Sequence, residues 1–313
     1  MTTVGSERGV CFGPNLGSID YTALFEQPGA WADVRGQLTA FKVYADNVLD
    51  HTQCGPNTYG ALCGANVFSR LVEWNLPLHL EAGAIKDWDP TGDTLTADAL
   101  SAIKRVQDAG GAVDIVSMDE PLASTILGAT RYPGAPKQLT ADHAGDVARY
   151  AANFARAVAT GGRRAAIIEA YPQHPAAFIC SFVRDIVQTN GVPLAFFELD
   201  VDVNGISDQK IKVDTVKQNF ANFRGMCADL GMAFRVIVTS TRATSADAYH
   251  QDVVSLGQRL RALVDQPFDG ATVQSWREYP SETMRQLPAN LPASDPNSHV
   301  GVLRAVLASG LVR

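Results

Sequence analysis

The chain has 313 residues, 46% of them hydrophobic and 19% charged, and its 26 Lys and Arg against 33 Asp and Glu give a net charge of −7. This globular composition excludes collagen, coiled coils and long disordered tracts. An acidic chain without a basic stripe is a poor partner for nucleic acid, and no apolar run reaches the roughly 18 residues that predict a membrane span.

Eight short runs rich in Val, Ile, Leu and Phe recur along the chain, each followed by polar residues. Such runs are typical of parallel strands that are covered by helices. The predicted strands are residues 9–14, 38–44, 76–81, 112–118, 164–169, 193–200, 233–239 and 270–276.

Helical segments alternate with these strands. Thr96 and Thr140 are predicted N-caps, and glycines follow several of the segments, as is common at helix C-termini. The predicted helices are residues 21–35, 57–74, 96–106, 140–159, 175–189, 214–230, 245–264 and 299–308.

Eight alternations of strand and helix predict an α/β protein, a (β/α)8 TIM barrel that spans residues 1–313 as a single domain. The rival fold is a doubly wound sheet. It usually carries a nucleotide-binding loop, and neither G-x-G-x-x-G nor G-x-x-x-x-G-K-[ST] occurs in the sequence.

Five cysteines are too few for a disulfide scaffold in a chain of this length. Cys54 and Cys63 share a glycine-rich stretch and could pair, but free thiols in a reducing compartment are the favoured interpretation. The first residues lack the apolar core of a secretory signal, so a cytoplasmic protein is expected, with a secreted form left open. No metal site and no cofactor are predicted.

Acidic residues end four consecutive predicted strands: Glu81, then Asp119 with Glu120, then Glu169, then Asp200. The catalytic residues of TIM barrels gather at these carboxyl ends. Each acid alone could cap a helix or pair with an arginine. Because burying carboxylates is costly, four neighbouring acidic ends instead predict a cleft for proton transfer, sugar binding or metal binding.

Three further residues are candidates for binding a substrate. Lys42 should point into the barrel and need a carboxylate partner, for which Glu81 is available. Tyr171 and Trp276 lie at strand ends, where each could fill the core or stack on a sugar ring.

The segment Met118-Asp119-Glu120-Pro121 resembles the end of strand four in the large retaining clan of barrel glycosidases, which carries Asn-Glu, often followed by Pro. The resemblance implies that Glu120 is the general acid/base. The clan places its nucleophilic Glu at the end of strand seven, where this chain has Thr239-Ser240-Thr241. The second carboxylate would then be Glu169 or Asp200.

The first hypothesis is therefore glycoside hydrolysis or transglycosylation of a small carbohydrate, with Glu81 and Asp119 holding sugar hydroxyls. Trp276 resembles the strand-eight Trp that lines sugar sites in such barrels. The alternatives are a metal-dependent sugar isomerase or lyase, with Glu81, Asp119, Glu169 and Asp200 as oxygen ligands, and a non-catalytic carbohydrate-binding barrel. Neither nucleic acid nor a membrane is expected as a partner.

Overall fold

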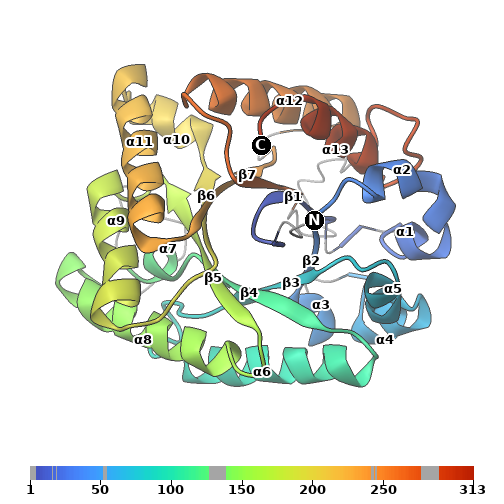
Figure 1. Ribbon diagram of the computed structural model, residues 1–313, viewed down its shortest axis with the longest axis horizontal. Coiled ribbons are helices and arrows are strands. Elements are labelled where there is room, and N and C mark those ends of the chain that lie inside the picture. Colours follow the sequence, from blue (N-terminus) through green and yellow to red (C-terminus); the bar gives the residue numbers. More distant parts are fainter. Residues whose placement is uncertain are drawn as a thin grey trace. The chain divides into compact units, whose positions relative to one another are not determined.

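The fold is a closed barrel of eight parallel strands in the order β1 to β8, alternating with helices, so the predicted (β/α)8 TIM barrel is confirmed (Figure 1). The computed structural model describes residues 5–15, 17–18, 20–51, 55–126, 139–240, 243, 245–275 and 289–313.

All eight predicted strands are present, with ends shifted by a few residues. Their apolar side chains are buried almost without exception, as expected of parallel strands covered by helices. The strands are β1 (Gly9–Gly13), β2 (Ala40–Tyr44), β3 (Leu78–Gly83), β4 (Val113–Asp119), β5 (Arg164–Tyr171), β6 (Phe196–Val201), β7 (Ala233–Val238) and β8 (Gly270–Gln274).

The helical elements are more fragmented than the sequence predicted. They are α1 (Ala23–Glu26), η1 (Pro28–Trp31), α2 (Ala32–Arg35), α3 (Ala45–Val48), α4 (Tyr59–Gly64), α5 (Val67–Glu73), α6 (Asp93–Asp108), α7 (Pro121–Thr125), η3 (Ala141–His143), α8 (Ala144–Val158), α9 (Ala176–Arg184), η4 (Asp185–Thr189), α10 (Val203–Asp208), α11 (Val213–Leu230), α12 (Ala246–Ala262) and α13 (His299–Ala308).

The differences have local causes. Pro28 interrupts the predicted helix 21–35, and Asn66, at φ 57°, interrupts the predicted helix 57–74. The prediction that Thr96 begins a helix is wrong, because α6 starts at Asp93 and the Thr96 hydroxyl instead donates to the carbonyl of Gly92. Thr140 precedes η3 without a capping hydrogen bond from its side chain.

Three short helices that the sequence did not predict, α3, α7 and α10, each begin immediately after a strand or one residue later. Among the described segments, none of the helices combines the length and apolarity that crossing a bilayer requires. Cys63 is a free thiol, and Cys54 lies outside the described residues.

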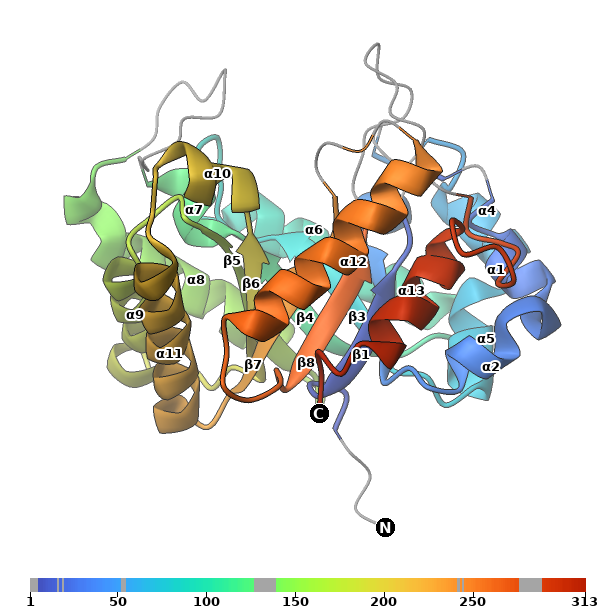
Figure 2. The ribbon, with the colours of Figure 1, turned by 90° about the horizontal axis from the view of Figure 1, so that it is seen from above.

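The chain divides into two compact units, and the prediction of a single domain stays a prediction. The first unit contains Met1–Leu80, Ser101–Asp114 and Ile237–Arg313. In it β1 pairs in parallel with β2 and with β8, and α12 packs beside α13 (Figure 2). A side chain at Gly13 would come within 3.1 Å of Gln274 and 3.3 Å of Lys42, so glycine leaves room for these two polar residues.

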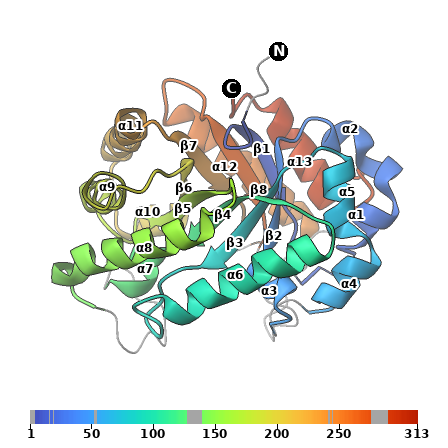
Figure 3. The same ribbon diagram turned by 60° about the horizontal axis from the view of Figure 1, so that its bottom comes forward.

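The second unit contains Glu81–Leu100 and Ile115–Val236. The strands β4 to β7 pair in parallel, with Asp119 of β4 level with Ile168 of β5, and Ile168 level with Glu198 of β6. Helix α9 lies between α8 and α11 along this part of the chain (Figure 3). Because α7 follows β4 and α10 follows β6, both short helices stand at the carboxyl ends of their strands.

A fully buried ion pair links β6 to β7. Nε of Arg235 donates to Oε1 of Glu198 over 2.9 Å, and neither side chain is exposed to solvent. The guanidinium also lies 4.9 Å from the ring centroid of Phe196. Removing one partner would leave a buried charge without its counterion, which costs much more than the pair itself contributes.

We expect Arg235→Met to lower the free energy of unfolding by about 3–5 kcal/mol, measured by urea denaturation. Adding Glu198→Leu should restore most of the loss. The exposed pair of Arg184 and Asp229 provides the control, since Arg184→Met should cost less than about 1 kcal/mol. Equal losses of unfolding free energy in the two arginine variants would contradict the conclusion that burial makes the loss of a partner costly.

Candidate active site

Glu120 occupies an unusual backbone conformation at the end of β4. It adopts φ 45° and ψ 53°, in the left-handed region, directly before Pro121. Its N–H donates to the carbonyl of Ile168 on β5 over 3.1 Å, and its carbonyl accepts from the N–H of Ser124 over 2.9 Å. A non-glycine residue in this region costs about 1–2 kcal/mol, and such strain is concentrated at functional sites.

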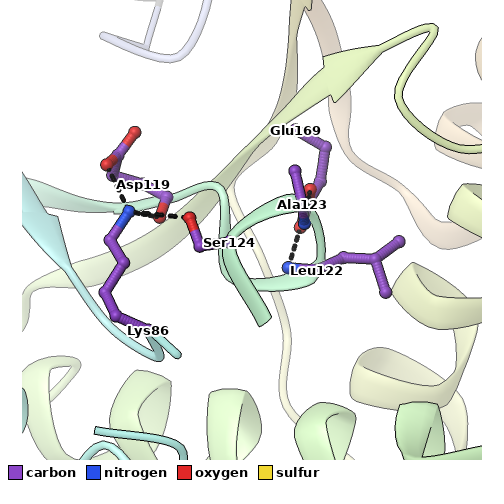
Figure 4. A network of polar contacts seen from close by, with 6 residues as sticks. All are labelled: Lys86, Asp119, Leu122, Ala123, Ser124 and Glu169. Atoms are coloured by element: carbon purple, nitrogen blue, oxygen red, sulfur yellow. Dashed lines mark hydrogen bonds and ion pairs between the residues drawn. The ribbon is translucent and has the colours of Figure 1, made fainter. Parts of the chain in front are cut away.

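Lys86, in the segment after β3, fixes the neighbouring Asp119. Its Nζ donates to Asp119 Oδ2 over 2.7 Å, to the Asp119 carbonyl over 3.0 Å and to Ser124 Oγ over 2.9 Å (Figure 4). Burial lowers the pKa of Lys86, but the charge of Asp119, the hydrogen bond to it and the charges of Glu120 and Glu169 together outweigh burial, and the net pKa is raised. The strand-end pattern missed Lys86, although a cluster of acids itself implies a nearby cation.

Burial and neighbouring charges act on the carboxyl group of Glu120. Burial raises its pKa well above the usual value, and the negative charges of Asp119 and Asp200 raise it further. Lys86 opposes this shift, while Glu169 adds a smaller rise. Because like charges resist ionising together, Glu120 is suited to hold a proton at neutral pH and release it to a reacting group.

Both carboxylate oxygens of Glu169 accept hydrogen bonds at the start of α7. Oε1 accepts from the N–H of Leu122 over 2.8 Å, Oε2 accepts from the N–H of Ala123 over 3.1 Å, and the side chain is fully buried (Figure 4). Burial raises the pKa of Glu169 to about 8, against the lowering effect of these two amides and of Lys86. Glu169 thus accepts from two amides at the start of α7, where the first N–H groups of a helix have no acceptor within the helix itself.

His174, in the loop after β5, binds the other end of α7. It is almost fully buried, and its ring hydrogen-bonds the backbone of Ile126 and Leu122. Burial lowers its pKa, while these two hydrogen bonds act in the opposite direction. Strand β5, through Glu169, and the loop after it, through His174, therefore contact α7 at both of its ends.

Asp200 brings a second carboxylate to Glu120 from β6. It is level with Ala170 of β5 and two residues beyond Glu198, so it shares a sheet face with the buried Glu198. Asp200 is half-buried, and its charge raises the pKa of Glu120. Among the predicted residues, the structure therefore brings Asp119, Glu120, Glu169 and Asp200 together.

The other predicted residues have different surroundings. Tyr171 is buried against α11, where its hydroxyl accepts from Nδ2 of Asn219 over 2.7 Å and its ring packs edge-on against phenylalanines, so its place is in the core. Lys42 is fully buried, and its Nζ donates to Oε1 of Gln274 over 2.7 Å. Glu81 is half-buried in β3, and its pairing with Lys42 stays a prediction.

An exposed tryptophan stands close to Lys86 along the chain. Lys86 and Asp89 exchange backbone hydrogen bonds, which form a tight turn, and Trp88 within this turn is 65% exposed. Asp89 is anchored in turn, because its carboxylate accepts from the N–H of Leu95 in α6 over 2.9 Å. Trp276, the predicted sugar-stacking residue, lies outside the described residues.

The described residues include no group of three or more His, Cys, Asp or Glu side chains arranged to hold a metal ion. The arrangement around Glu120 has a different character. It combines two buried carboxyls with raised pKa values, Glu120 and Glu169, with Asp119, which is paired with Lys86, and with the half-buried Asp200. Such a set can protonate a leaving group and stabilise a developing positive charge.

No protein-family model and no curated protein matches the chain. Solved structures do share its fold. An endo-β-1,4-xylanase of glycoside hydrolase family 10 from Gloeophyllum trabeum is 12% identical, with 99% of each chain covered and a TM-score of 0.53. A psychrophilic endo-β-1,4-xylanase of the same family is 11% identical, with 96% of each chain covered and a TM-score of 0.50.

A xylose isomerase domain protein from Alicyclobacillus acidocaldarius is 12% identical, with 96% of this chain and 95% of that chain covered and a TM-score of 0.45. At such identities the likeness shows the barrel fold alone. The neighbours include glycoside hydrolases as well as a sugar isomerase-like protein.

We expect the carboxyl groups to make the protein less stable as the pH rises. The pKa of Glu169 is about 8 in the folded protein against 4.5 ordinarily. Between these values the folded state holds a proton that the unfolded chain has lost, so the free energy of unfolding falls with rising pH. Glu169→Gln should flatten part of this decline in urea midpoints measured from pH 5 to 8, and parallel profiles would contradict the raised pKa.

Proposed function

We propose that the protein is a glycoside hydrolase, or a transglycosylase, in which Glu120 is the general acid and Asp200 is the second carboxylate. The observation that carries the proposal is the raised pKa of Glu120, caused by burial and by two neighbouring carboxylates at the end of β4. A carboxyl that stays protonated beside one that ionises is the pair that glycosidic bond cleavage uses.

Asp200 is a better partner for Glu120 than Glu169. Both oxygens of Glu169 accept backbone N–H groups, so an attack by Glu169 on a sugar would have to break these hydrogen bonds. Asp200 is half-buried, on the same face of β6 as Glu198, and its charge acts on Glu120. These features support Asp200 as the nucleophile or the base.

The reaction follows from these roles. Glu120 gives its proton to the leaving oxygen as the glycosidic bond breaks, and the charge of Asp200 stabilises the positive charge that develops on the sugar ring. Asp119, held by Lys86, is placed to accept hydrogen bonds from sugar hydroxyls. Water completes hydrolysis, whereas a second sugar hydroxyl in its place gives transglycosylation.

Neutral polysaccharides are the first substrates to test. Two of the solved structures with this fold are endo-β-1,4-xylanases, which makes xylan a reasonable starting point. The exposed ring of Trp88 offers an apolar face of the kind that stacks on sugar rings. A role for Trp276 in binding the sugar stays a prediction.

The alternatives are less well supported. A metal-dependent isomerase needs a set of oxygen or nitrogen ligands, and the described residues provide no such group. A carbohydrate-binding barrel without activity does not require a carboxyl whose pKa is raised next to a second acid.

We expect Glu120→Gln to lower kcat on a natural glycoside by about 10²–10⁴-fold, because the leaving oxygen loses its proton donor. A dinitrophenyl glycoside, whose leaving group departs without a proton, should retain most of its rate in the bond-breaking step. The measurement is a comparison of initial rates on both substrates, with unfolding curves to check the fold. Near-normal activity on the natural glycoside would exclude Glu120 as the acid.

We expect Asp200→Asn to lower kcat on both substrates by a similar factor, since the second carboxylate is needed whatever the leaving group. Nuclear magnetic resonance of the first product identifies its anomer and so distinguishes retention from inversion. If the variant behaved like Glu120→Gln and kept its rate on the activated substrate, Asp200 would not be the second carboxylate.

A further inference from the structure

We propose that Glu169 is a positioning residue, which fixes helix α7 and thereby holds Glu120 in its left-handed conformation. The inference rests on the proposed function, in which Glu120 is the acid. It assigns Glu169 a task other than attack on the sugar, because this residue of β5 would act on catalysis without contact with the substrate.

The first step of the argument is that α7 cannot hold itself together. It has five residues, whereas isolated helices shorter than about 12 residues are marginal in water. Pro121 fills the first position, where no N–H is needed, but the amides of Leu122 and Ala123 have no partner inside the helix. External groups must therefore stabilise the helix.

Glu169 meets this need completely. One carboxylate oxygen binds each of the two amides, at 2.8 Å and 3.1 Å, and the whole side chain is excluded from solvent. Both oxygens keep lone pairs that accept from the amides below the pKa of about 8, and above this pKa the bonds gain the strength of an ionised acceptor. Since Glu169 lies in β5, these bonds tie α7 directly to the barrel sheet.

Two more contacts fix α7 in the same place. His174 hydrogen-bonds the backbone of Leu122 and Ile126, and Lys86 donates to the hydroxyl of Ser124. Glu169 and His174 both come from the β5 segment, while Lys86 comes from the segment after β3. The helix is therefore held from both of its ends and from one side.

The link to Glu120 is covalent and short. Glu120 immediately precedes Pro121, a position from which the proline ring disfavours helical backbone angles, and it stands at φ 45°. Such a conformation persists only when its surroundings enforce it. If α7 were released, Glu120 would be free to relax toward negative φ, and its carboxyl group would leave the position set beside Asp119 and Asp200.

Three variants test the proposal. Glu169→Gln keeps one acceptor oxygen, and Glu169→Ala keeps none. The control is Asp202→Asn, because Asp202 accepts from the N–H of Asn204 over 3.0 Å at the start of α10, another short helix that follows a strand. Hydrogen exchange of the intact protein reports on α7 independently of activity.

We expect amide exchange at Leu122 and Ala123 to rise about tenfold in Glu169→Gln, which loses one acceptor, and more in Glu169→Ala, which loses both, since one lost hydrogen bond corresponds to about a tenfold change. On xylan, or on another glycoside that the wild type cleaves, kcat should fall roughly 100-fold in Glu169→Ala with KM little changed, because a misplacement near 1 Å has such an effect. Glu169→Gln should rescue part of the loss.

The pH profile separates positioning from mere structural support. Burial and the charges of Asp119 and Asp200 raise the pKa of Glu120, Lys86 lowers it, and Glu169 adds a smaller rise once it ionises, above its own pKa of about 8. The basic limb of kcat should therefore move to lower pH in Glu169→Gln. Asp202→Asn should leave the basic limb of the kcat profile and the amide hydrogen exchange of α7 as they are in the wild type.

The results that would overturn the proposal are distinct. Unchanged exchange in α7 would show that Glu169 does not hold the helix. Faster exchange with full kcat would show that the helix does not position Glu120. Recovery of Glu169→Ala by azide, which attacks the anomeric carbon as the protonated leaving group departs, would make Glu169 the nucleophile. If the wild type cleaves no glycoside, the proposed function fails, while the exchange data still decide whether Glu169 holds α7.

Discussion

The organisation of this site follows from one electrostatic constraint: carboxylates that share a partly buried space cannot all ionise. Asp119 is paired with Lys86, Asp200 is half-buried, and Glu169 accepts from two backbone amides while burial raises its pKa to about 8. Burial and the charges of Asp119 and Asp200 raise the pKa of Glu120 well above its usual value. The acid chemistry of Glu120 is therefore a property of its neighbours.

The backbone around α7 supports the role of Glu120 as well. A five-residue helix would be a poor foundation for a catalytic group, yet α7 is bonded to β5 and to the segment after β3. These bonds supply the rigidity that helix length does not. They also explain how a glutamate can remain in left-handed geometry before a proline, where its intrinsic preferences are unfavourable.

The strands were predictable because buried parallel strands leave a strong apolar signal, and so were the acids at their carboxyl ends. The short helices and the side-chain contacts of the site could not be predicted in this way. Helix α7 is too short to produce a periodic pattern, and Lys86 is recognisable only through Asp119, a partner distant in sequence. The two interpretations of Tyr171 were separated only by its packing against α11. Capping by Glu169 depends on tertiary proximity, which no local pattern contains.

Lys86 has a consequence for how such a site changes in evolution or in the laboratory. A single ammonium group ties together a loop, the last residue of one strand and a side chain of the next helix. None of these three parts is then an independent module. Transplanting the loop into another barrel would succeed only if the recipient also offered an acid and a hydroxyl in matching places, so diversification here requires concerted rather than stepwise substitution.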